Sequence, residues 1–85
     1  MGRPRVRTAV VAGEVVGQVR HLFGTSKNAY RNLLLDGPRS GISYWEFQRV
    51  WQGKTVTPAH AHVVEEAWRA WRARMQAGEA RREVA

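Results

Sequence analysis

Apolar residues recur three and four positions apart in four segments of the chain, which is the spacing of one face of an α-helix. The segments are residues 8–23, 25–35, 43–52 and 57–75. Their apolar positions are Val11, Val15 and Val19; Ala29, Tyr30, Leu33 and Leu34; Phe47, Val50 and Trp51; and Val64, Trp68, Trp71 and Met75. The pattern predicts a small all-α domain of four helices.

The third segment has the clearest limits. Ser43 is a good N-cap, with Glu46 in the capping-box position three residues later. Gly53 suits a helix end because it adopts positive φ without strain. Thr57 followed by Pro58 is a second helix start. We therefore expect a short helix from Ser43 and a new helix from Thr57.

The first segment allows two interpretations. Gly13, Gly17 and many β-branched residues lower its helix propensity, so a hairpin turning at residues 12–14 competes with a helix. On a helix, Glu14, Gln18 and His21 would all lie away from the stripe of valines. The two-residue repeat of a β-strand would not separate these polar residues from the valines as cleanly. This favours a helix over residues 8–23.

Charge is concentrated in the first two thirds of the chain. The net charge is +7, with nine basic and three acidic residues in 1–56 but five and four in 57–85. A positive field of this kind favours polyanionic partners such as nucleic acid. Residues 1–7 form a basic arm, in which Gly2, Arg3 and Pro4 resemble the core of minor-groove AT-hook peptides.

Composition excludes several other classes. The 85 residues form one domain, 44% of them hydrophobic, with no cysteine and no apolar run of membrane-spanning length. His60 and His62 point to different sides of a helix, and Glu65 and Glu66 are adjacent and do not converge. We therefore expect a cytoplasmic protein that is not an enzyme, with no metal, cofactor, small-molecule ligand or membrane partner.

Residues 42–67 carry a resemblance to a known family. The matching positions are Ile42, Ser43, Tyr44, Arg49, Val50, Gly53, Lys54, Val56, Pro58, Val63 or Val64, and Ala67. This pattern resembles the recognition-helix segment of the lactose-repressor family of helix-turn-helix domains, within the lambda-repressor-like class. It covers about a third of the chain. The connection DGPRSG at residues 36–41 is longer than the usual turn of three or four residues, so the expected motif has an extended turn.

The resemblance implies binding of double-stranded DNA by a small bacterial or phage-type transcriptional regulator, with residues 42–52 in the major groove. The expected base contacts are Tyr44, Trp45, Gln48 and Arg49. The expected backbone or minor-groove contacts are Arg3, Arg5, Arg7, Lys27, Asn28, Arg31, Ser43 and Lys54. Trp45 departs from the small or amide residues usual at its position.

The last segment leaves two alternatives open. Trp68, Trp71 and Met75 either cover the first helix or form the interface of a homodimer. The expected organisation is an arm in residues 1–7, a domain in 8–75 and a frayed tail in 76–85. Exposed aromatic and arginine residues also suit a protein-interaction module, and a packaging or recombination factor would share the same physics.

Overall fold

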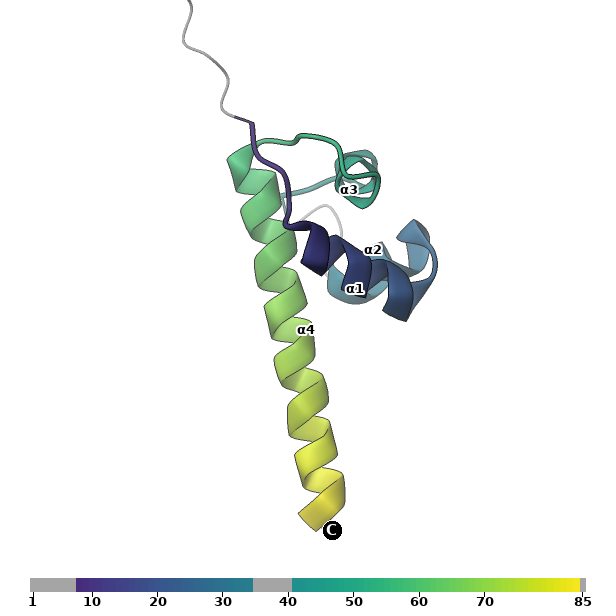
Figure 1. Ribbon diagram of the computed structural model, residues 1–85. Coiled ribbons are helices and arrows are strands. Elements are labelled where there is room, and N and C mark those ends of the chain that lie inside the picture. Colours follow the sequence, from purple (N-terminus) through teal and green to yellow (C-terminus); the bar gives the residue numbers. More distant parts are fainter. Residues whose placement is uncertain (1–7, 35–40, 85) are drawn as a thin grey trace, which may run out of the picture.

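The computed structural model describes residues 8–34 and 41–84, with side chains as far as residue 78. It contains α1 (Gly13–Phe23), α2 (Ser26–Leu33), α3 (Tyr44–Trp51) and α4 (Pro58–Val84) (Figure 1). In the part of the chain that the structure describes, no strands pair into a sheet. One isolated antiparallel β-bridge joins Ala9 to Val56. The prediction of a small four-helix, all-α domain is confirmed.

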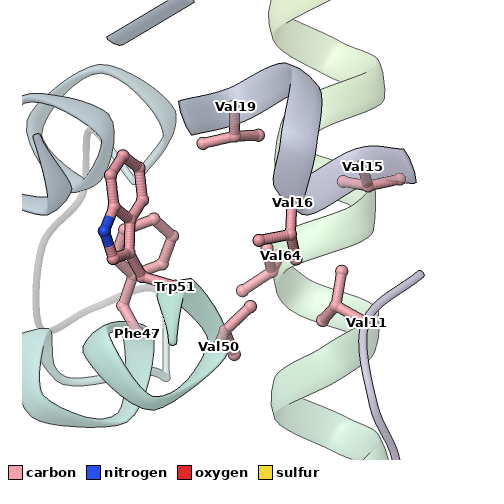
Figure 2. A pocket seen from close by; sticks show the side chains of 8 residues that line it. All are labelled: Val11, Val15, Val16, Val19, Phe47, Val50, Trp51 and Val64. Atoms are coloured by element: carbon pink, nitrogen blue, oxygen red, sulfur yellow. The ribbon is translucent and has the colours of Figure 1, made fainter. Parts of the chain in front are cut away.

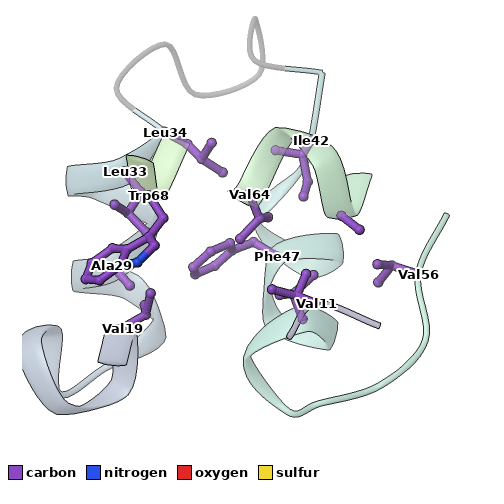
Figure 3. Close-up of a cluster of buried hydrophobic side chains, with 12 residues drawn as sticks. Val11, Val19, Ala29, Leu33, Leu34, Ile42, Phe47, Val56, Val64 and Trp68 are labelled. Carbon is purple, nitrogen blue, oxygen red and sulfur yellow. The ribbon is translucent and has the colours of Figure 1, made fainter. Parts of the chain in front are cut away.

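The three shorter helices lie beside the N-terminal half of α4, and the C-terminal half of α4 continues past them (Figure 1). Each helix contributes side chains to one apolar core (Figure 3). Phe47 from α3 and Ile42 just before it are each 1% exposed, and Ala29 of α2 is completely buried. Of the three apolar positions that the spacing predicted for α3, Phe47 and Val50 are buried and Trp51 is half-buried.

A small apolar pocket lies between α1, α3 and α4 (Figure 2). Its volume of about 10 Å³ is at the lower limit for a single water molecule. Valine, phenylalanine and tryptophan side chains line it: Val11, Val15, Val16, Val19, Phe47, Val50, Trp51 and Val64. The pocket is a packing gap in the core and is too small to hold an organic ligand.

The limits of α3 follow the predicted capping. Ser43 Oγ accepts a hydrogen bond from the Glu46 N–H at 3.2 Å and donates one to Glu46 Oε1 at 3.1 Å. At the other end Gly53 has φ +75°, and the N–H groups of Gly53 and Lys54 donate to the carbonyls of Val50 and Arg49. These two bonds form a Schellman motif, so α3 is closed at both ends.

The next helix starts as predicted. Thr57 Oγ1 accepts from the His60 N–H at 3.3 Å, and Pro58 is the first helical residue. At the start of α2, Thr25 Oγ1 accepts from the Asn28 N–H at 3.2 Å. Each of these caps satisfies a backbone donor that the helix itself leaves free.

The first segment forms a helix, as predicted, but a shorter one than residues 8–23. Its helix begins at Gly13, and the residues before it pair with the loop after α3, not with each other. Ala9 and Val56 exchange two backbone hydrogen bonds, at 2.7 and 2.8 Å. The β-branched Val10 and Val11 favour this extended backbone, and Val11 is buried by it.

The last helix is longer than predicted. The sequence indicated fraying from residue 76, whereas α4 continues to Val84. Alanine, arginine, glutamine and glutamate dominate this stretch and all have high helix propensity, which outweighs the single Gly78.

Candidate nucleic-acid interface

The outward face of α3 carries an aromatic, a cation and an amide in a row. Trp45 is 73% exposed, and Arg49 and Gln52 are also exposed. They are spaced i, i+4, i+7, so they lie on one side of the helix, opposite Phe47 and Val50. We call Trp45, Arg49 and Gln52 the α3 outward stripe. Gln48, a predicted base contact, is half-buried at its edge.

Tyr44, also predicted to contact bases, does not belong to this stripe. Its hydroxyl lies 2.8 Å from Ser26 Oγ of α2, and its ring packs edge-on against Tyr30 with centroids 5.6 Å apart. The side chain is half-buried. Tyr44 therefore faces α2 and joins it to α3, instead of facing outward with Trp45 as the sequence indicated.

Glu46 is turned to the other flank of α3, toward α4. Its Oε2 lies 2.6 Å from His60 Nε2, while Oε1 accepts from Ser43. Oε2 is buried and has no hydrogen bond of ordinary geometry within the described part of the chain, so the contact with the imidazole compensates its burial. The predicted capping role of Glu46 is confirmed. The carboxylate is thus held away from the outward stripe.

Arg49 lies at the junction between α3 and the loop that follows it. Its guanidinium makes one long contact, Nη2 to the Thr55 carbonyl at 3.5 Å, and the residue is exposed. It lines an open groove with Thr8, Thr57 and His60 among others. A side chain held this loosely is available to an acceptor outside the protein.

Arg20 of α1 is a residue of this site that the sequence did not reveal. Its guanidinium donates to the Trp51 carbonyl through Nε at 3.0 Å and also through Nη2. The same group lies 5.6 Å from the centre of the Trp51 ring. Thirty-one residues separate the two, and no local pattern links them, so only the folded chain shows that α1 holds the end of α3.

Some of the residues predicted to contact the DNA backbone are exposed, and others use their side chains in hydrogen bonds within the protein. Lys27, Arg31 and Lys54 are exposed. Asn28 is engaged, because its Nδ2 donates to the Phe23 carbonyl at 3.0 Å. Ser43 uses its hydroxyl in the α3 cap. Arg3, Arg5 and Arg7 lie outside the described residues.

The predicted dimer contacts are mostly internal. Trp68 is 6% exposed, and Trp71 is half-buried, stacked on Trp68 at 5.7 Å and edge-on to Phe23 of α1 at 5.2 Å. Of the two alternatives, the pair of tryptophans therefore covers α1. Trp68 is thus almost fully buried in the single chain, whereas Met75 remains 45% exposed.

Two further observations limit the chemistry of the described residues. None of their histidine, aspartate and glutamate side chains form a group of three that could hold a metal ion. No helix among them combines the length and apolar character needed to span a bilayer. Protein-family models, curated proteins and solved structures were compared with the chain, and none of them matches it. The resemblance to the lactose-repressor family therefore stays a prediction.

Proposed function

We propose that this chain binds duplex DNA sequence-specifically, with α3 in the major groove, and acts as a small transcriptional regulator of the helix-turn-helix type. The observation that carries the proposal is the outward stripe. A capped helix buries one face in the core and presents Trp45, Arg49 and Gln52 on the other. The net charge of +7 supplies the attraction to phosphate.

Each side chain of the stripe suits a different feature of a base edge. The Arg49 guanidinium matches guanine O6 and N7, and the amides of Gln48 and Gln52 match adenine N6 and N7. Trp45 has only an apolar surface to offer and suits the thymine methyl group. The proposed base contacts therefore include Gln52, which the sequence did not predict, and exclude Tyr44, whose hydroxyl contacts Ser26.

Positive side chains on neighbouring elements suit the phosphates. Lys27 and Arg31 on α2 and Lys54 after α3 are exposed. The predicted arm residues Arg3, Arg5 and Arg7 would add backbone or minor-groove contacts. The one carboxylate of α3, that of Glu46, is held by Ser43 and His60 on the side of α4, away from the outward stripe.

The proposal is tested by selecting bound sequences from a random duplex pool and then measuring affinities by fluorescence anisotropy. Arg49→Ala is expected to relax selection at one base pair, at a cost of about 1–3 kcal/mol on the selected site. Lys27→Ala, the matched control, should weaken selected and random duplexes alike and reduce the salt slope by about one. Equal loss on both duplexes for Arg49→Ala would remove its base-reading role.

A second candidate is supported by Trp45, since a 73% exposed tryptophan beside an arginine is also the composition of a protein hot spot. Affinity for random duplex DNA as a function of salt separates the two. A protein-interaction module would show no binding even at low ionic strength, whereas a DNA-binding domain would bind and weaken steeply as salt rises.

A further inference from the structure

An open groove runs between α1 and α4, and no residue of the α3 outward stripe lines it. Its walls include Glu14, Gly17 and Leu22 from α1, and Trp68 and Arg72 from α4. Leu22 is 49% exposed. Met75, one turn beyond Arg72 on the same side of α4, is 45% exposed. An isolated domain therefore leaves two large apolar side chains in water at one end of this groove.

Gly17 is the unusual residue of the groove. It sits in the middle of α1, where glycine is less stable than alanine. Its backbone has no positive φ, and a Cβ built on it would meet no atom within 4 Å. Nothing described in the chain thus requires glycine at this position. A bare helix surface does allow a second backbone to approach closely.

The groove carries a negative side chain, Glu14, and a positive one, Arg72, so two copies of the groove can pair opposite charges. Glu14 lies in the first turn of α1, while the Phe23–Trp71 ring contact brings the last turn of α1 to the part of α4 that carries Arg72. The Arg72 guanidinium lies 5.9 Å from the centre of the Trp68 ring on the α4 wall of the groove, while the Glu14 carboxylate belongs to the N-terminal end of the α1 wall. In a two-fold contact, residue i of one copy meets residue j of the other, and residue j of the first copy meets residue i of the second. Each pair of opposite charges therefore occurs twice.

We propose that this groove is the contact surface of a two-fold dimer of the chain, in which α1 of one copy packs on α1 of the other at Gly17. Glu14 of each copy then faces Arg72 of the other, and Leu22 and Met75 become covered. The proposal does not depend on DNA binding. It shares Trp68 and Met75 with the dimer predicted from the sequence, and it differs in that Trp71 packs on α1 and that α1 itself forms half of the contact.

Sedimentation equilibrium from about 1 μM to about 1 mM covers the range of weak to moderate association and tests the dimer directly. A concentration-dependent dimer is expected for the unmodified chain. Gly17→Ala should raise the unfolding temperature of the dilute monomer, because its methyl group enters open space, and should weaken dimerisation about tenfold. A chain that stays monomeric throughout, or a dimer unaffected by Gly17→Ala, would overturn the proposal.

Charge reversal tests the two-fold geometry. Glu14→Arg and Arg72→Glu should each weaken the dimer, and the double variant should restore it because the pairing is then reversed across the interface. Arg74→Glu is the matched control, since Arg74 is exposed on another side of α4, and it should leave the dimer unchanged. Circular dichroism of each variant verifies that the fold is retained. A double variant as weak as either single one, or a control that weakens the dimer equally, would overturn the arrangement.

Discussion

The guanidinium of Arg20 donates to the carbonyl oxygen of Trp51 and lies 5.6 Å from the centre of its indole ring, so one side chain of α1 holds the last turn of α3. The final carbonyls of a helix lack intrahelical donors and carry the negative end of its dipole. The Arg20 guanidinium donates to one of these carbonyls, and its positive charge offsets the negative end of the helix dipole. The orientation of the outward stripe thus depends partly on α1.

Removing this link should destabilise the domain. Arg20→Ala is expected to lower the free energy of unfolding by about 1–2 kcal/mol, because a charge-assisted hydrogen bond and a cation–π contact are lost. Arg20→Lys should recover only part of the loss, since an ammonium cannot reproduce the two-pronged donation. Urea denaturation measures both. Arg74→Ala, at an exposed site, should change the free energy by less than about 0.5 kcal/mol. An Arg20→Ala variant as stable as this control would contradict the assigned contact.

The adjacent Tyr44 and Trp45 should respond in opposite ways. Tyr44→Phe removes the hydroxyl contact with Ser26 and should cost about 0.5–1.5 kcal/mol of stability while leaving base preference unchanged. Trp45→Ala removes a 73% exposed side chain and should change stability by less than about 0.5 kcal/mol while weakening binding to the selected duplex. Thermal denaturation and anisotropy give the two readouts. Altered base preference in Tyr44→Phe would mean that its hydroxyl reaches the ligand.

The contact between Glu46 and His60 joins α3 to α4 and should be measurable as a coupling. A double-mutant cycle with Glu46→Gln and His60→Ala is expected to give a coupling energy of about 0.5–1 kcal/mol, as the pair is only partly shielded from solvent. Glu46→Gln is the suitable change because the amide oxygen can still accept from Ser43. Additive effects of the two substitutions would show that the contact contributes nothing to stability.

Gly53 should be intolerant of a side chain for a backbone reason. Its φ of +75° is the left-handed conformation, which costs an L-residue roughly 1–2 kcal/mol, so Gly53→Ala should destabilise the domain by about that amount. Gly78→Ala is the matched control, since Gly78 is helical with ordinary φ and open space around it. Chemical denaturation should show the control as unchanged or slightly more stable. Equal effects at both positions would rule out backbone strain as the cause.

The sequence predicted those parts of the fold that depend on near neighbours. The caps of α3 and α4 involve residues three apart, and the buried positions of α3 follow from helical spacing. Contacts between residues far apart in the chain leave no pattern in the sequence from which they could be predicted. Tyr44 lies beside Trp45 in the chain, yet its partner Ser26 is eighteen residues earlier, so spacing alone placed Tyr44 on the wrong face.

The limits of α1 and α4 were mispredicted for different reasons. Residues 8–12 share the apolar spacing of a helix, but pairing with Val56 gives Ala9 two hydrogen bonds in an extended form. At the other end, Gly78 and the mixed charges suggested fraying, whereas the surrounding residues are strong helix formers. In the first case a tertiary contact overrides local pattern, and in the second local propensity outweighs one glycine.

The pairing of Ala9 with Val56 also joins the segment before α1 to the loop after α3. Thr8, the residue at which the arm meets the domain, lines the same groove as Arg49. A ligand in that groove would therefore contact both of the paired segments at once, and its binding would stabilise the folded form that holds them together.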